Sequence, residues 1–390
     1  MSLLRRTSYC ADGVRVRAVN LVEALGVEIG VRVAGSPEAA AAAGRIAGAF
    51  RELGLEPSFQ EFQFLGYDHE EPELEIDGEP WAAGPAGYAP PTPPQGVEGS
   101  ARYLGDYPFI PGIMLSPVFA IEDEDGGELA RLVANPIGGG AIPFPTYCRL
   151  PVHGGPMAMI TTADGDRLGS LDEPHARLRT GGKFVPGRRD RNVIARIAGE
   201  SEETVIVSAH FDSVWRGPGV IDNVTGVEGM LRVAARFAGR TDLPRSLAFC
   251  AFGAEEIGLS GAYHYVDEAK ISGELDRTVG VVNLDCIAHG SHFELLVGPD
   301  ELEGRAVALA QHLGLTERYE LDILPPVTGS DHYPFAVQKI PAVCILHFPY
   351  PEYHLPEETV DLVDEQKMAD SVELAVALVE SQLERPVPRA

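Results

Sequence analysis

The sequence has little cysteine, little positive charge and no long apolar run. Its 390 residues include five scattered cysteines, and 31 Lys and Arg stand against 58 Asp and Glu, a formal charge of −27. No segment approaches the roughly 20 apolar residues of a membrane-spanning helix. These shortages disfavour a disulfide framework, a membrane protein and a nucleic-acid-binding protein. The excess of carboxylates suits positively charged partners such as peptide amines.

The cysteines and the amino terminus bear on the cellular compartment. Cys250, Cys286 and Cys344 lie in or beside apolar runs and are predicted to be free, buried thiols, whereas Cys10 and Cys148 have no such context. No apolar signal region follows the basic start at Met1–Arg6. We therefore expect a cytoplasmic protein. Export stays an alternative if a leader has been trimmed away, and a homo-oligomer is also an open alternative.

The order of predicted elements indicates an α/β fold. Ser36-Pro37-Glu38 is a helix start, Gly54 can end that helix, and Phe59–Phe64 is predicted to be a strand. Apolar runs then alternate with helical stretches, which predicts a largely parallel sheet covered on both faces. The predicted strands are Val193–Ile197, Thr204–Ser208, Ser246–Phe252, Thr278–Leu284, Phe293–Val297 and Ala342–Phe348, and the predicted helices are Val224–Phe237, Glu301–Leu313 and Glu365–Leu383.

Residues 67–187 have a different texture from the rest of the chain. They are rich in proline and glycine, as in Ala89-Pro90-Pro91-Thr92-Pro93-Pro94, and show little helical periodicity. We predict an inserted, mostly-β subdomain there, within a catalytic domain formed by residues 1–66 and 188–390.

Acidic residues and histidines follow the ends of the predicted strands. In open α/β sheets, sites form beyond the carboxyl ends of strands, so these side chains should converge. They are His210 and Asp212, Glu255 and Glu256, Asp285, and His354, joined by Asp222 just before a predicted helix.

Two histidines and three carboxylates from this set are the types of side chain that bind zinc. Imidazole and carboxylate are the ligands of zinc sites that keep an open position. Five ligands with one shared carboxylate fit two ions roughly 3.5–4 Å apart. One carboxylate of the Glu255-Glu256 pair would bind metal while the other takes a proton from water and passes it to a leaving amine.

At these residues the sequence resembles the co-catalytic zinc peptidases typified by bacterial leucyl aminopeptidases. That family also contains glutamate carboxypeptidases, glutaminyl cyclases and transferrin-receptor-like proteins. The resemblance covers roughly residues 30–64 and 190–384 and implies a three-layer zinc-exopeptidase domain with a mixed, largely parallel sheet. The matching segments are Ala209-His210-Phe211-Asp212-Ser213, Asp222-Asn223-Val224-Thr225-Gly226, Glu255-Glu256-Ile257-Gly258-Leu259-Ser260-Gly261, Asn283-Leu284-Asp285, Ser330-Asp331-His332 and Tyr353-His354-Leu355-Pro356-Glu357-Glu358-Thr359-Val360-Asp361. Two further segments also match, Val33-Ala34-Gly35-Ser36-Pro37 and Asn192-Val193-Ile194-Ala195.

The resemblance also implies a role for each site residue. His210 and Asp285 would hold one Zn²⁺, Glu256 and His354 the other, and Asp222 would bridge them. Glu255 would be the general base and then the acid, Asp212 would orient His210, and Tyr353 would stabilise the oxyanion. The peptide bond from Asp222 to Asn223 would be cis, and the insert would stand where some relatives carry a protease-associated domain.

The expected function is hydrolysis of amino-terminal residues from peptides. Three alternatives stay open at this point. A glutaminyl cyclase would use one working zinc at the same site. A carboxypeptidase would need cations for the substrate's carboxylate, which the basic residues Arg177, Arg179, Lys183, Arg188, Arg189 and Arg191 could supply. A receptor-like relative would need broken ligands, and none is broken here.

Overall fold

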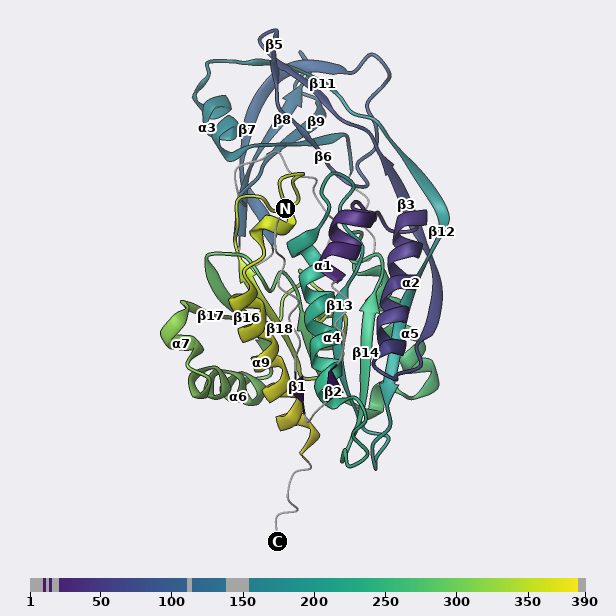
Figure 1. The fold of residues 1–390 in the computed structure, drawn as a ribbon. Coiled ribbons are helices and arrows are strands. Elements are labelled where there is room, and N and C mark those ends of the chain that lie inside the picture. Colours follow the sequence, from purple (N-terminus) through teal and green to yellow (C-terminus); the bar gives the residue numbers. More distant parts are fainter. Residues whose placement is uncertain (1–9, 12–13, 16–20, 111–113, 138–153, 385–390) are drawn as a thin grey trace, which may run out of the picture.

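Two eight-stranded sheets organise the molecule, one in a helix-covered body and one in the insert (Figure 1). The computed structural model describes residues 10–11, 14–15, 21–110, 114–137 and 154–384. A small antiparallel pair, β1 (Cys10–Ala11) and β2 (Val14–Arg15), precedes both sheets.

The body sheet is mixed and has the strand order β17-β16-β18-β15-β13-β14-β12-β3. Its central strands β18, β15, β13 and β14 run parallel to one another, whereas β12 and β3 at one side are antiparallel to their neighbours. At the other side β16 pairs antiparallel with β18 and parallel with β17. The strands are β3 (Ser58–His69), β12 (Gly182–Ile197), β13 (Thr204–His210), β14 (Ser246–Phe252), β15 (Thr278–Leu284), β16 (His292–Gly298), β17 (Leu321–Leu324) and β18 (Ala342–Phe348).

Helices cover both faces of this sheet, which makes three layers. Along β14, Leu247, Phe249 and Ala251 join one buried cluster, and the alternate residues Ala248, Cys250 and Phe252 join the other. Burial on both faces explains why the strand is a continuous apolar run. On the first face lie α1 (Leu21–Glu23) with the π-helical turn Ala24–Ile29, α2 (Pro37–Glu52), α4 (Gly226–Phe237), α6 (Asp300–His312) and α9 (Glu365–Leu383), and on the second lie α5 (Ser260–Ser272) and α8 (Tyr333–Ala336).

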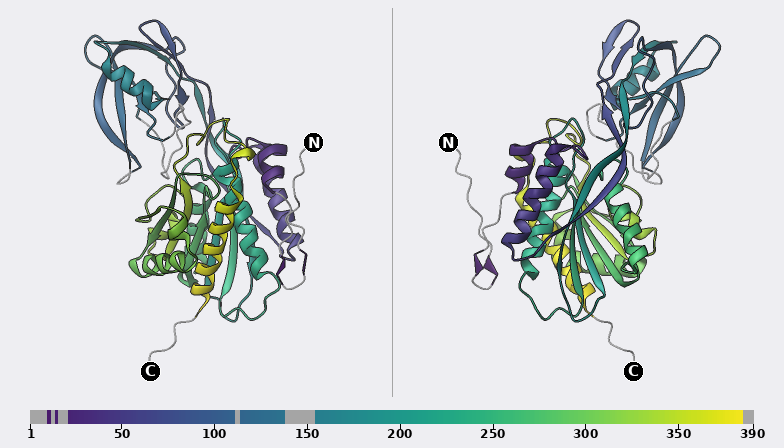
Figure 2. Two further views of the ribbon diagram at one scale, coloured as in Figure 1. Left: turned by 60° about the vertical axis from the view of Figure 1, so that its left-hand side comes forward. Right: turned by 90° about the vertical axis from the view of Figure 1, so that its right-hand side faces the viewer.

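The insert stands at one end of the body on a long two-stranded ribbon (Figure 2). Strands β3 and β12 form this ribbon, pairing from Ser58 with Ile194 as far as His69 with Gly182. The insert sheet has the order β5-β4-β11-β7-β8-β9-β10-β6. Its elements are β4 (Glu73–Ile76), β5 (Glu79–Trp81), β6 (Gly84–Pro85), β7 (Val97–Ile110), β8 (Met114–Glu122), β9 (Glu128–Ala134), β10 (Met157–Ile160), α3 (Thr162–Ser170) and β11 (His175–Arg179).

The predicted α/β fold is confirmed, and the predicted strands all occur in the body sheet. Ser36 caps α2 by accepting a hydrogen bond from the Ala39 N–H at 3.0 Å, as the capping signal predicted. The prediction did not include α5, β17 or the short helices α7 (Leu315–Arg318) and α8. Two short 3₁₀ helices, Leu275–Arg277 and Val360–Leu362, also occur. Within the described residues, no helix has the length and apolar character needed to cross a bilayer.

Cys250, Cys286 and Cys344 are free and buried, as predicted. Cys148 lies outside the described residues.

Candidate active site

The structure brings the predicted ligands together at the carboxyl end of the central strands. His210 is the last residue of β13, Asp285 directly follows β15, and the Glu255-Glu256 pair begins three residues after β14. Asp222 lies in the turn Val220–Thr225 that leads into α4, and His354 lies in the loop after β18. All six residues are buried, with at most 6% of their surface exposed.

Asp222 lies between the two histidines. Its Oδ1 is 3.0 Å from Nε2 of His210, and its Oδ2 is 3.0 Å from Nε2 of His354. The two carboxylate oxygens therefore face different imidazoles. This is the arrangement expected of a carboxylate shared between two metal positions.

The remaining carboxylates gather around the same histidines. Nε2 of His210 is 3.5 Å from Asp285 Oδ1 and 3.9 Å from Glu255 Oε2, and Nε2 of His354 is 3.4 Å from Glu256 Oε2. Ligand-type atoms of His210, Asp222 and Glu256 lie within 4.8 Å of one another, as do those of His210, Glu255 and Asp285. These atoms are therefore close enough together to contact a shared metal ion.

The charge of the cluster is suited to cations. No described Lys or Arg forms an ion pair with Asp222, Glu255, Glu256 or Asp285, although all four are buried. Burial, and then the neighbouring carboxylates, raise the pKa of Glu256 well above its ordinary value, and burial also raises the pKa of Glu255. Oε1 of Glu256 and Nδ1 of His210 have no hydrogen-bond partner. Because buried charges need compensation, this ligand set fits divalent metal.

Asp212, which was expected to orient His210, contacts the backbone of the Glu255-Glu256 pair. Its Oδ1 accepts a hydrogen bond from the Glu255 N–H at 3.0 Å, and its Oδ2 accepts one from the Glu256 N–H at 3.2 Å. Its carboxylate is 3.6 Å from Nδ1 of His210, beyond hydrogen-bond distance. Asp212 therefore holds the backbone of the Glu-Glu pair in place, and its action on His210 stays a prediction.

The turn that carries Asp222 is built by the next residues of its motif. The peptide bond between Asp222 and Asn223 is cis, as the resemblance implied. The Asn223 side chain donates to the Leu284 carbonyl at 2.9 Å and accepts from the N–H groups of Gly226 and Cys286. A Cβ at position 226 would collide with Asn223 Oδ1 and the Leu284 carbonyl, so only glycine fits there.

Glu358 links the two loops that carry Asp222 and His354. Its Oε1 accepts hydrogen bonds from the N–H groups of Ile221 and Asp222, and its Oε2 accepts one from the N–H of His354 at 3.2 Å. The side chain is 1% exposed. A single carboxylate therefore accepts hydrogen bonds from both the loop of Asp222 and the loop of His354.

Asp285 is supported by a chain of buried polar groups. Ser330 Oγ donates to Asp285 Oδ2 at 2.5 Å, Asn283 Nδ2 donates to Ser330 Oγ at 2.7 Å, and Ser208 Oγ donates to Asn283 Oδ1 at 2.7 Å. Because each of these donors is satisfied in turn, the chain orients the carboxylate of Asp285 toward the cluster.

Arg32 stabilises the loop after β13 through buried hydrogen bonds. Its guanidinium is fully buried and donates to the carbonyl groups of Phe211, Leu25, Gly30, Pro218 and Gly219 at 2.5–3.4 Å. Its backbone N–H donates to Ser213 Oγ. Burial lowers the pKa of Arg32 to about 10, so the group stays charged. The arginine thus fastens the loop between the His210 and Asp222 positions to the π-helical turn at Ala24–Ile29.

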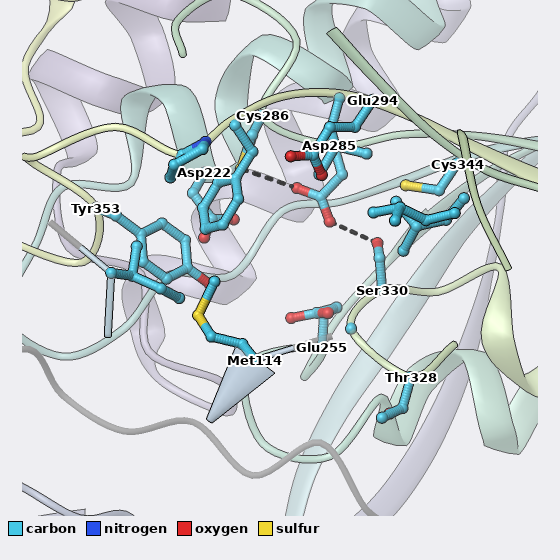
Figure 3. Close-up of a pocket in the computed structure, with 17 residues that line it drawn as sticks. Met114, Asp222, Glu255, Asp285, Cys286, Glu294, Thr328, Ser330, Cys344 and Tyr353 are labelled. Carbon is cyan, nitrogen blue, oxygen red and sulfur yellow. Dashed lines mark hydrogen bonds between the residues drawn. The ribbon is translucent and has the colours of Figure 1, made fainter. Parts of the chain in front are cut away.

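A cavity of about 820 Å³, counting its open mouth, lies beside the cluster (Figure 3). Asp222, Glu255 and Asp285 line one side of it, and Met114 and Ile137 of the insert line another. The insert therefore contributes directly to the walls of the site.

Tyr353 and Cys286 both line this cavity (Figure 3). The ring of Tyr353 stacks on His354 with centroids 3.7 Å apart. Cys286 Sγ contacts Asp285 Oδ1 at 3.4 Å, and its thiol pKa is raised well above the ordinary value by burial. Cys286 is thus a free, buried thiol, as the sequence predicted, and its Sγ also belongs to a group of metal-ligand-type atoms with Asp222 and Asp285.

The basic cluster at the end of the insert does not reach the cavity. Arg177, Arg179, Arg188 and Arg191 form ion pairs with Glu75, Glu73, Asp68 and Glu61 of the neighbouring strands. None of the six basic residues lines the cavity. The carboxypeptidase alternative therefore loses the feature that supported it.

Sequence reasoning did not assign roles to Arg32, Glu358 and Ser330. Glu358 and Ser330 occur inside the familial segments, and that proximity was the available signal. Arg32 stands between two valines with no motif, and nothing in its sequence context signals a buried guanidinium.

Comparison with known proteins agrees with the geometry of the site. Residues 192–379 match the model of peptidase family M28. Aminopeptidase YwaD of Bacillus subtilis is 27% identical over 238 residues, which is 57% of this chain and 50% of that protein. The Mycobacterium tuberculosis protein named "Probable lipoprotein aminopeptidase LpqL" is 26% identical over 73% of this chain and 60% of its own length. The matched regions thus span between half and three fifths of these two relatives.

Solved structures share the whole architecture. A zinc aminopeptidase from Bacillus subtilis has a TM-score of 0.69 at 23% identity and covers 93% of this chain and 94% of its own. A peptidase M28 precursor from Shewanella amazonensis has a TM-score of 0.73 at 18% identity and covers 95% of both chains. At such identities, the likeness establishes the fold, with the insert included in the aligned length.

Proposed function

We infer that this chain, whose residues 192–379 match the model of peptidase family M28, is a zinc-dependent aminopeptidase that removes amino-terminal residues from peptides. The observation that carries the proposal is the position of Asp222, whose two carboxylate oxygens each lie 3.0 Å from a different histidine within a buried acidic cluster. The names of the relatives add support, because the curated and solved proteins described above are aminopeptidases or M28 peptidases.

We propose which of two zinc ions each ligand binds. His210 and Asp285 would hold one zinc ion, Glu256 and His354 the other, and Asp222 both. When bound, the two ions would polarise the scissile carbonyl and lower the pKa of the attacking water toward about 7. The fit rests on the uncompensated carboxylates and on the unpartnered oxygen of Glu256.

Glu255 is the proposed general base. It lines the cavity, and its raised pKa, caused by burial, suits a group that must exchange a proton near neutral pH. It would take the proton from the attacking water and deliver it to the leaving amine. Asp212 would hold the Glu255 backbone so that the carboxylate points into the cavity, and the Tyr353 hydroxyl would stabilise the oxyanion.

A preference for chain ends is supported by the insert. Met114 and Ile137 close one side of the cavity beside the acidic cluster. An extended peptide passing through would meet this wall, whereas a free amino terminus could end against the carboxylates. The positive charge of that terminus complements the buried acidic groups.

The decisive experiment compares wild type with Glu255→Gln on amino-acid anilides and on amino-terminally blocked peptides, with zinc content measured on both proteins. We expect wild type to carry two zinc ions and to cleave only unblocked substrates. The variant should keep its zinc and lose about 10²- to 10⁴-fold in kcat. Glu52→Gln, in the last turn of α2 and exposed, is the matched control and should behave as wild type.

Other outcomes would redirect the assignment. Cleavage of blocked peptides from the carboxyl end would replace the aminopeptidase by a carboxypeptidase. A product lighter by ammonia, with one zinc bound, would indicate a cyclase. Full activity after removal of all metal would rule out zinc-assisted hydrolysis.

A further inference from the structure

One wall of the cavity carries a carboxylate that the proposed mechanism does not use. Glu294, on β16, lines the cavity together with Leu296, Leu324 and Leu346 (Figure 3). The Glu294 side chain is half-buried, and no hydrogen bond or ion pair joins its carboxylate to another described side chain. An acidic group set among leucines without a partner is costly in a structural role and therefore suggests a ligand.

The strand register explains how Glu294 comes to face the cavity. Phe293, Leu295 and Val297 belong to the core on one face of β16, so Glu294 and Leu296 point to the other face. Across the sheet, Glu294 pairs with Leu346 on β18 and with Asp322 on β17, and Leu296 pairs with Cys344 and Leu324. This face is therefore a leucine-lined surface with Glu294 set within it.

The position of Glu294 relative to the proposed metal site fits a long side chain. Asp285 follows β15, which is separated from β16 only by β18. Two strand spacings correspond to about 10 Å. A substrate whose first residue lies at Asp285 and Asp222 could therefore extend a lysine or arginine side chain along the leucines to Glu294.

The other charged groups near Glu294 do not neutralise it. On its own strand, His292 is bound through Nδ1 to Asp322 Oδ2 at 2.6 Å, so the imidazole is already engaged. Burial, and then the charge of Asp322, raise the pKa of Glu294 to about 7, and His292 offsets this only in part. A cation brought by a substrate would relieve this unfavourable environment.

We propose that this cavity receives the first side chain of the peptide and that Glu294 selects long aliphatic side chains ending in a cation, those of lysine and arginine. The leucines would contact the methylene stem, and the carboxylate would bind the ammonium or guanidinium group. This inference rests on the proposed aminopeptidase function and specifies its substrate class.

The test uses two substrates that differ only in the terminal charge. Lysine and norleucine anilides share a straight four-carbon stem, and only lysine carries the ammonium group. For the zinc-loaded wild type, we expect kcat/KM to be higher for lysine. Glu294→Gln should lower the value for lysine about tenfold and change the value for norleucine less than about twofold, since hydrogen bonds to charged groups contribute that much.

Two further variants keep the result specific. Glu320→Gln removes an exposed carboxylate just before β17 that does not line the cavity, so it should leave both substrates unchanged. Glu294→Arg should reverse the preference and favour norleucine over lysine. Thermal unfolding of each variant verifies that the fold is retained, which we expect because the Glu294 side chain forms no hydrogen bond or ion pair with another described side chain.

A binding measurement separates this inference from the proposed function. Lysinol and norleucinol have no scissile bond, and their affinities for zinc-loaded protein can be measured by calorimetry. Tighter binding of lysinol to wild type but not to Glu294→Gln supports the inference even if no anilide is cleaved, an outcome that would refute only the peptidase activity. Cleavage of norleucine anilide with no lysine preference, or an equal loss for both substrates in Glu294→Gln, would overturn the inference and leave the peptidase intact.

Discussion

The carboxylate of Glu358 accepts the backbone N–H of Asp222 at 2.7 Å and at the same time binds the backbone N–H of His354. Asp222 and His354 lie 132 residues apart in the sequence, and Glu358 holds the loops of both. The spacing of the proposed metal ligands therefore depends on a residue that does not bind metal.

Replacing Glu358 by Gln should weaken zinc binding. A glutamine side chain has one acceptor oxygen and cannot satisfy both loops, so one of them would move. We expect zinc affinity to fall about 10- to 100-fold, measured by competition with a chromophoric chelator. Glu357→Gln changes the exposed neighbour and should have no effect. Unchanged affinity in Glu358→Gln would show that the loops hold their positions without this carboxylate.

Tyr353→Phe separates packing from catalysis. Phenylalanine keeps the ring that stacks on His354 and removes only the hydroxyl. If the hydroxyl stabilises the oxyanion, kcat should fall about 10²-fold while KM and zinc content stay unchanged. Steady-state kinetics on an anilide substrate measures this, and a normal kcat would assign Tyr353 to packing alone.

Removing metal should lower thermal stability. Without cations, the buried carboxylates of Asp222, Glu255, Glu256 and Asp285 repel one another. Zinc at a free concentration of 100 times its Kd should stabilise the fold by about 2.7 kcal/mol. Differential scanning calorimetry of chelator-treated protein, followed by zinc titration, should show a lowered midpoint that two equivalents restore. Identical midpoints with and without zinc would contradict binding at this cluster.

Arg32→Met should destabilise the fold strongly. Five backbone carbonyl groups lose their donor, and each buried acceptor left unsatisfied costs about 1–3 kcal/mol unless water replaces the donor. We expect the free energy of unfolding to fall by at least about 3 kcal/mol in urea denaturation. Arg51→Met, on the exposed side of α2, is the control and should change stability by less than about 0.5 kcal/mol. A similarly small loss for Arg32→Met would mean that the loop is held by other contacts.

His347 should make stability depend on pH. Its side chain is fully buried between Phe293 and Tyr319, and burial lowers its pKa from 6.5 to about 3. The unfolded chain therefore takes up a proton near pH 6.5 that the folded protein does not accept, so this contribution to stability is lost as the pH falls from 6.5 toward 3.

Urea denaturation at pH 7 and pH 4.5 would measure this effect. The variant His347→Phe should lose less stability between these pH values than wild type, by about 2 kcal/mol. His312→Gln, on the exposed end of α6, should follow wild type. Equal pH slopes for wild type and His347→Phe would show that this histidine is protonated in the folded state.

The sequence by itself determined the body of the fold and the position of the candidate site. Strands such as β14 are buried on both faces, so their continuous apolar runs can be recognised in the sequence without a structure. Because parallel strands end at one edge, the acids and histidines that follow them could be predicted to meet, and they do.

Only the tertiary structure decided which groups position the proposed metal ligands and which residues surround them. Arg32 and Glu358 act through backbone groups brought close by folding, and no periodic pattern records such contacts. Glu294 and Met114 reach the cavity through strand register and through the placement of the insert on its ribbon. Local patterns encode which face of an element is buried, whereas contacts between distant segments depend on the packing of the whole chain.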